Sequence, residues 1–448
     1  MNKETIKSVI LIALVCSSLF LTLALWTYQP EYEELDQTTY LEETELDGEQ
    51  RNFGHVVHPK QIVFNDSRQY SKLPTKELEM DLFAEITEWD FSNIDERPSS
   101  GSWGVWSPNM ELVFQEEIPM VLIDQIFQID EFNYEWNPNR TFNRVFFQLT
   151  QGSEERIQVS FTSDGEEEVL NGVIESVSAY EYIEEFFNRA DVITLDRVDL
   201  ETNEDQSYIY LTNEQVEVPE QTVFTEDLNE QPLINVLFSN PALVRQQNAE
   251  SQHEEYYTDG TRLLTLVDVF NSNQFLTYNK PSTLEPLEPT SRRELMLRSL
   301  EYTNDHHGWT DDYRLDTLDR DNSTINYRIH YKGIPVFDSD DFMTMVQVWG
   351  QQELQSLSRP LFKITDPLPE GERVELQSGV SVYNYLVNSS DELSMSLIED
   401  IKIGYEVVED QGVSNTVTFL EPTWFVKYVG TWRPLSYFED RVAFKEDG

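Results

Sequence analysis

The chain has 448 residues, of which 83 are Asp or Glu and 31 are Lys or Arg, so its formal net charge is −52. This charge excludes nucleic acid as a natural partner, because phosphate binding requires clustered cations. Disorder throughout is excluded as well, since 39% of the residues are apolar and 12% are aromatic. The length and the aromatic content together predict two or three folded domains.

One apolar segment lies near the N-terminus. It reads VILIALVCSSLFLTLALW from Val9 to Trp26 and carries no charge. At about 1.5 Å per residue it extends for about 27 Å, close to the ~30 Å of a bilayer core. We predict a transmembrane helix over residues 9–28, with Lys3 and Lys7 in the cytoplasm and the acidic residues that follow outside. A cleaved signal peptide is the alternative, but no small-x-small cleavage site follows the segment.

Small residues recur on this predicted helix at a spacing of four. Such spacing lets two helices approach closely in lipid, and hydroxyl groups can then bond across the interface. The residues concerned are Ala13, Ser17, Ser18, Thr22 and Ala24. We interpret them as a helix–helix contact face; ordinary apolar filler with tolerated Ser and Thr is the alternative.

The remainder of the chain lacks cysteine, because Cys16 is the only one. An exported region without disulfides is typical of a bacterial exterior. Its acidity is explained by a solvated surface suited to saline or alkaline surroundings, or by attraction to a basic partner. Composition does not separate these two explanations.

Six parts are predicted along the chain, and folding is expected to begin near His55. They are a cytoplasmic tail at 1–8, the membrane helix at 9–28, an acidic linker at 29–54, an N-terminal α/β domain at 55–175, a central α+β domain at 176–284 and a C-terminal α+β domain at 285–448. The linker carries many like charges, which extend a chain. The last boundary follows from the prolines within 280–290.

Hydrophobic periodicity predicts the elements of the N-terminal part. A strand carries Ile62 and Phe64 on one face. A helix begins near Thr75, and its apolar face is formed by Leu78, Leu82, Phe83, Ile86 and Trp89. A hairpin then pairs RVFFQL with RIQVSF across a short turn at 151–153.

Two capping boxes predict further helices. One runs from Ser178 to Glu181 and the other from Ser291 to Glu294. The C-terminal part is rich in strands, with a short helix around Tyr383. We therefore expect an α+β fold: one N-terminal transmembrane helix, then a multi-domain extracytoplasmic region of mixed, largely antiparallel sheets with helices.

Candidate metal and catalytic motifs are weak. His306-His307 lies beside acidic residues that could complete a metal site, but neighbouring histidines in a polar loop are more commonly a solvated helix exit. Glu111, Glu116 and Glu117 lie near Trp103 and Trp106, which raises the possibility of glycoside hydrolysis or glycan binding. In so acidic a chain this proximity has little specificity. We expect no catalytic residue, no metal and no cofactor.

The assembled features resemble the YycH (WalH) family of membrane-anchored regulators. The resemblance rests on the basic N-terminus and single span, then HPKQIVF, YRIHYKGIPVF, SRPLF, ELQSG, DIKIGY and EPTWFV, in that order. The C-terminal half, 285–448, also resembles the companion regulator YycI. Because YycI proteins are shorter, the additional N-terminal region favours YycH.

This resemblance implies a non-enzymatic regulator in the cell membrane, single-pass, with the N-terminus in the cytoplasm. It implies binding to a YycI-like regulator and to the WalK sensor kinase, largely through transmembrane helices, and adjustment of cell-wall two-component signalling. A homodimer is possible. The alternative is a protein that binds a cell-wall polymer, or, less favoured, a wall hydrolase.

Overall fold

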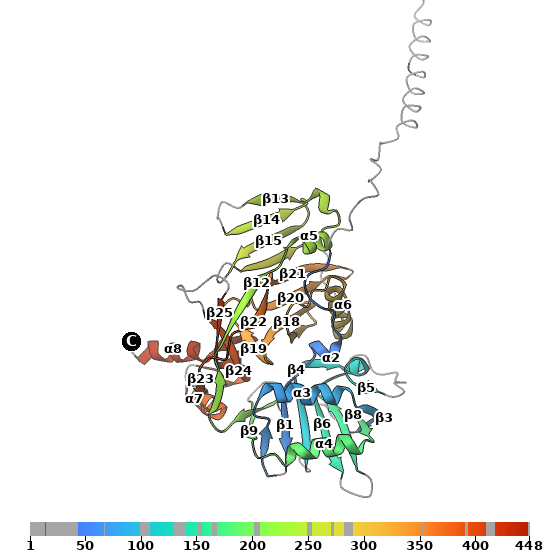
Figure 1. The fold of residues 1–448 in the computed structure, drawn as a ribbon, viewed down its shortest axis with the longest axis vertical. Coiled ribbons are helices and arrows are strands. Elements are labelled where there is room, and N and C mark those ends of the chain that lie inside the picture. The colour runs from blue at the N-terminus through green and yellow to red at the C-terminus, as the bar shows by residue number, and fades with distance from the viewer. Residues whose placement is uncertain are drawn as a thin grey trace, which may run out of the picture. The chain divides into compact units, whose positions relative to one another are not determined.

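The structure is a computed structural model. It describes residue 14 and residues 44–66, 68–98, 108–129, 140–150, 155–163, 168–200, 207–248, 253–269, 273–281, 290–351, 353–389, 393–408 and 417–446. Residues 44–448 form one compact unit. Two large β-sheets organise this unit (Figure 1).

The first sheet contains ten strands. They are β1 (Pro59–Asn65), β2 (Tyr70–Lys72), β3 (Asp90–Pro98), β4 (Asn109–Pro119), β5 (Gln128–Ile129), β6 (Thr141–Thr150), β7 (Arg156–Thr162), β8 (Glu168–Ile174), β9 (Ile193–Asp199) and β10 (Tyr208–Thr212). Their order is β10-β9-β2-β1-β4-β6-β7-β8-β3-β5, and only β3 and β5 pair in parallel. The predicted hairpin is confirmed, because β6 and β7 pair with Phe147 opposite Val159.

Helices α3 (Lys76–Thr87) and α4 (Val177–Phe187) cover one face of this sheet (Figure 1). The ring of Phe83 on α3 lies 6.3 Å from that of Phe114, and Phe186 on α4 stacks on Phe64 at 5.9 Å. Ile62 and Phe64 point to this helical face, as their spacing of two predicts. These aromatic contacts join strands and helices into one hydrophobic core.

The second sheet contains fourteen strands. They are β12 (Gln221–Asp227), β13 (Arg245–Asn248), β14 (Glu254–Thr258), β15 (Leu263–Asp268), β16 (Gln274–Asn279), β17 (Tyr313–Asp319), β18 (Thr324–Tyr331), β19 (Ile334–Phe337), β20 (Thr344–Trp349), β21 (Leu354–Pro360), β22 (Phe362–Pro367), β24 (Ile398–Val408), β25 (Val417–Tyr428) and β26 (Thr431–Pro434). Only β19 and β24 pair in parallel. The predicted central domain, 176–284, contributes strands to both sheets.

The remaining elements are one small sheet and five helices of the described residues. Strands β11 (Val216–Pro219) and β23 (Arg373–Leu376) form a two-stranded sheet. The helices are α2 (Phe53–Val56), α5 (Gln231–Leu237), α6 (Arg292–Asp305), α7 (Gly379–Asn388) and α8 (Leu435–Glu446), with 3₁₀ turns at Met120–Gln125, Pro241–Leu243 and Met395–Leu397. Helix α7 confirms the short helix predicted around Tyr383.

Serine and threonine caps set most of the helix starts. The side chains of Thr75 and Ser291 accept hydrogen bonds from Leu78 N and Glu294 N, so the predicted cap at Ser291 is confirmed and the helix expected near Thr75 begins there. The predicted cap Ser178 is wrong by two residues. The hydroxyl of Ser176 accepts from Ala179 N instead, and Ser178 donates to or accepts from Ser176 at 2.9 Å.

The linker prediction is too long at its C-terminal end, because residues 44–54 belong to the folded unit. Leu46 is buried, and its backbone N–H donates to the carbonyl of His306 at 2.8 Å. Arg51 N donates to Asn304 Oδ1 at 2.8 Å. Isolated apolar residues such as Leu46 have no period, so hydrophobic patterning does not reveal this segment.

The predicted α+β class with largely antiparallel sheets is confirmed. The predicted span at 9–28 lies outside the described residues apart from Leu14, and so do all five residues of the proposed helix–helix contact face. Within the part of the chain that the structure describes, no helix has the length and apolar character required to cross a bilayer.

Candidate functional site

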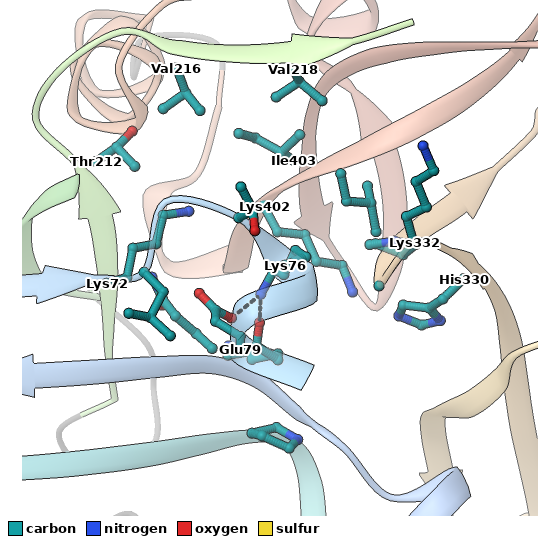
Figure 2. Close-up of a pocket in the computed structure, with 18 of the residues that line it drawn as sticks. Lys72, Lys76, Glu79, Thr212, Val216, Val218, His330, Lys332, Lys402 and Ile403 are labelled. Atoms are coloured by element: carbon teal, nitrogen blue, oxygen red, sulfur yellow. Dashed lines mark hydrogen bonds and ion pairs between the residues drawn. The ribbon is translucent and has the colours of Figure 1, made fainter. Parts of the chain in front are cut away.

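A cavity of about 250 Å³ lies where the first sheet meets the second; we call it the junction pocket. Strands β1, β2 and β10 and the start of α3 line it from the first sheet. Strands β18, β19 and β24 line it from the second sheet, and β11 closes one side. Figure 2 shows Lys76 and Lys402 near the centre of this region, with Lys72 on the left and Lys332 on the right.

Positive charge is concentrated in the junction pocket. Five of the eleven lysines of the chain line it, namely Lys60, Lys72, Lys76, Lys332 and Lys402. Two arginines, Arg314 and Arg373, and six carboxylates complete its charged lining. Cations therefore slightly outnumber anions here, whereas acids outnumber bases by 83 to 31 over the chain.

Three of these lysines are paired with carboxylates. The ion pairs are Lys60–Asp400 at 2.7 Å, Lys76–Glu79 at 2.6 Å and Lys332–Glu370 at 2.8 Å. The first of them joins β1 to β24, so it connects the two sheets. Their charges are locally balanced.

A buried charge network holds the fourth lysine. Lys402 Nζ lies 3.9 Å from Asp316 Oδ1, and Arg328 Nε donates to Asp316 Oδ2 at 2.9 Å. Burial raises the pKa of the Asp316 carboxyl, but Arg328 and Lys402 outweigh burial and leave that pKa below its usual value. Burial lowers the pKa of Lys402 to about 7, although Asp316 and Asp400 oppose this shift. Lys402 also donates to Gln115 on β4 at 3.2 Å.

Lys72 is the exception. No hydrogen bond or ion pair joins its ammonium to any residue that the structure describes. Burial lowers its pKa to about 8, an effect that Glu79 opposes and Lys76 reinforces. Within the described ranges, the ammonium at the end of β2 thus lines the cavity with no carboxylate in direct contact.

Apolar side chains form the opposite side of the junction pocket. Figure 2 shows Val216 and Val218, both on β11, together with Ile403 on β24, on one side of the lysines. Ile209 and Leu211 on β10 extend this wall and are buried. The arrangement suits a ligand with one anionic end and one apolar end.

Replacing Lys72 with Met is expected to raise the free energy of unfolding at pH 7 by about 1–2 kcal/mol. The pKa falls from 10.5 to about 8, so the protonated amine is disfavoured in the fold, and the partial exposure of the side chain reduces the effect. The gain should shrink between pH 8 and 10.5, because the wild type gains stability as its folded-state amine loses its charge. Urea denaturation measures the free energy of unfolding of both proteins. An unchanged or lower stability of Lys72→Met at pH 7 would contradict the prediction.

The glutamates considered for hydrolysis have other partners. Glu111 is buried, forms a close ion pair with Arg144 and accepts from the hydroxyl of Tyr210 at 2.6 Å. Glu117 pairs with Arg292 at 3.2 Å. Burial raises the pKa of Glu116 to about 7, despite Lys427 at 4.0 Å. Trp103 and Trp106 lie outside the described residues. All three carboxylates thus serve as ion-pair partners.

His306 and His307 lie at the end of α6, but His306 is not solvated. Its side chain is only 1% exposed, and burial lowers its pKa to about 3. His307 lies 3.6 Å from Glu45. Over the described ranges, no group of three His, Cys, Asp or Glu side chains is placed to hold a metal ion.

Sequence reasoning missed the junction pocket. One signal was available: Lys60, Lys72 and Lys76 fall within seventeen consecutive residues of a chain that has eleven lysines in 448. The other half of the pocket, around Lys402, is more than 300 residues away along the chain. Only the tertiary fold brings the two halves together.

Comparisons with known proteins match nearly the whole chain. The model of the YycH protein N-terminal domain matches residues 4–192, and that of the YycH protein C-terminal domain matches residues 206–441. The two-component system WalR/WalK regulatory protein YycH of Bacillus subtilis (strain 168) is 22% identical over 457 aligned residues, covering 97% of both chains. The crystal structure of YycH from Bacillus subtilis aligns with a TM-score of 0.69 at 19% identity, over 87% of this chain and 99% of that one.

Proposed function

Because this chain belongs to the YycH family, we propose that it is a non-enzymatic regulator of a WalR/WalK-type two-component system. The observation that carries this proposal is the match over nearly the full length to a protein named for that role. A match to one domain alone would leave the regulatory assignment open.

We propose further that the chain is held in the cell membrane by the helix at 9–28, with residues 44–448 outside the cell. Its partners are a YycI-like regulator and the WalK sensor kinase. A protein with a few cytoplasmic residues cannot reach a kinase domain there. Its influence must therefore pass through the membrane helix, the extracytoplasmic unit, or both.

A reporter assay tests the regulatory role. In a strain that lacks the gene, a WalR-dependent promoter is expected to change its output, and the full chain supplied from a plasmid should restore it. Crosslinking in membranes should capture WalK and the YycI-like protein in the same strain. Capture of wall polymer without either protein would support the alternative role in wall binding.

Replacing Ala13 and Ser17 together with Leu is expected to weaken partner association about fivefold. Leu preserves the hydrophobicity needed for insertion but fills the small-residue face, and one helix–helix contact contributes about 1 kcal/mol. Crosslinking yield and reporter output are the measurements. The matched control is Val15→Leu with Leu19→Ile, which alters other positions of the helix. If both double substitutions have the same effect, or neither has any, the small residues do not form a contact face and the helix serves only as an anchor.

A further inference from the structure

We propose that the junction pocket binds a small organic phosphate ester, with its phosphate at Lys72 and its organic group against the wall of β10, β11 and β24. This goes beyond the regulatory role and does not depend on which kinase the chain regulates. It assigns a ligand class to a site whose residues come from both sheets.

The first argument is the distribution of charge pairs inside the junction pocket. Lys60, Lys76 and Lys332 each lie within 2.8 Å of a carboxylate oxygen, and Lys402 belongs to the Asp316 network. Lys72 lacks such a partner among the described residues. An ammonium that is partly withdrawn from water gains stability from a close counter-ion, and an external anion can supply that contact.

The second argument is the helix that starts beside Lys72. Thr75 caps α3, and its first two residues, Lys76 and Glu77, line the junction pocket. The N-terminus of a twelve-residue helix carries partial positive charge and unpaired N–H groups, which suit a phosphate. Lysine is also a common phosphate ligand, as a compact point charge. Lys72 and the start of α3 line the same cavity.

The third argument concerns ligand size. A cavity of about 250 Å³ lies just below the ~300–1,000 Å³ of typical small-molecule sites. The net charge of −52 repels anions at long range, and it repels a polyanion far more than a small ester with one or two charges. The wall of Val216, Val218 and Ile403 favours an ester with an apolar group over inorganic phosphate.

Calorimetry on the purified full chain in detergent tests this inference, with phenyl phosphate as the probe at pH 7. The wild type should bind it, should bind inorganic phosphate at least fivefold more weakly, and should not bind phenol measurably. Phenol binding as tight as that of phenyl phosphate would overturn the proposal. So would the absence of phenyl phosphate binding.

Variants assign the phosphate to Lys72. Lys72→Met should weaken phenyl phosphate binding at least tenfold, and Lys72→Arg, which retains the charge, should stay within about threefold of the wild type. The matched control is Lys280→Met, which removes the same charge at the end of β16, where Lys280 is paired with Glu353. Thermal unfolding of each variant establishes that it folds. Equal binding by Lys72→Met and the wild type would overturn the assignment.

Discussion

Replacing Asp316 with Ala is expected to lower the free energy of unfolding by about 3–5 kcal/mol. Asp316 is 3% exposed and lies between the buried cation Arg328 and the partly buried cation Lys402. Removing the carboxylate leaves both cations without their shared counter-ion, and an uncompensated buried charge costs this much. Urea denaturation at pH 7 measures the loss.

The control for this substitution is Asp341→Ala. Asp341 also pairs with Arg328, at 3.1 Å, but its side chain is 58% exposed. Exposed pairs contribute at most about 1 kcal/mol, so the loss should be small. Replacing Asp316 with Leu and Arg328 with Met together should restore part of the stability, because the buried pair is then removed as a unit. Equal losses for Asp316→Ala and Asp341→Ala would contradict the ranking by burial.

His306→Leu is expected to remove about 2 kcal/mol of acid destabilisation between pH 7 and pH 5. In the fold, burial lowers the pKa of His306 from 6.5 to about 3, whereas the unfolded chain takes up the proton near pH 6.5. The unfolded state therefore binds more protons in this range, and the wild type loses stability as the pH falls from 6.5 toward 3. At pH 5, which is 1.5 units below the unfolded-state pKa of 6.5, this one group lowers the free energy of unfolding by about 2 kcal/mol.

The measurement is the difference in unfolding free energy between wild type and His306→Leu at each pH. His58 and His330, whose pKa values burial also lowers, are present in both proteins and cancel in the difference. His253→Gln is the control, since His253 is 77% exposed. A difference between wild type and His306→Leu that does not vary with pH would show that the His306 ring is accessible to protons.

Local signals in the sequence were sufficient for single elements of the fold. Ser291 could be recognised as a cap because the bond it makes reaches only three residues along the chain. The error at Ser178 is also local. Ser176 and Ser178 are both candidate caps for one helix start, and their hydroxyls lie 2.9 Å apart. Periodicity alone does not decide between them.

The junction pocket could not be predicted in this way. Lys60 and Asp400 are 340 residues apart in sequence, and Lys402 and Gln115 are 287 apart. No period or motif relates such positions. The YycH resemblance indicated the family correctly, but its motifs, among them HPKQIVF and DIKIGY, indicated no ligand site, even though they contain Lys60 and Lys402.

The ion pair between Lys60 and Asp400 has a consequence for the timing of chain synthesis. At about 5–20 residues per second, Asp400 is made roughly 17–70 s after Lys60. The ten strands of the first sheet end at Thr212, so that sheet can form well before β24 exists. During this interval Lys60 has no Asp400 to pair with and the cavity lacks one wall. Completion of the pocket therefore marks a nearly finished chain, and a nascent product that stops before β24 would present its lysines to the outside.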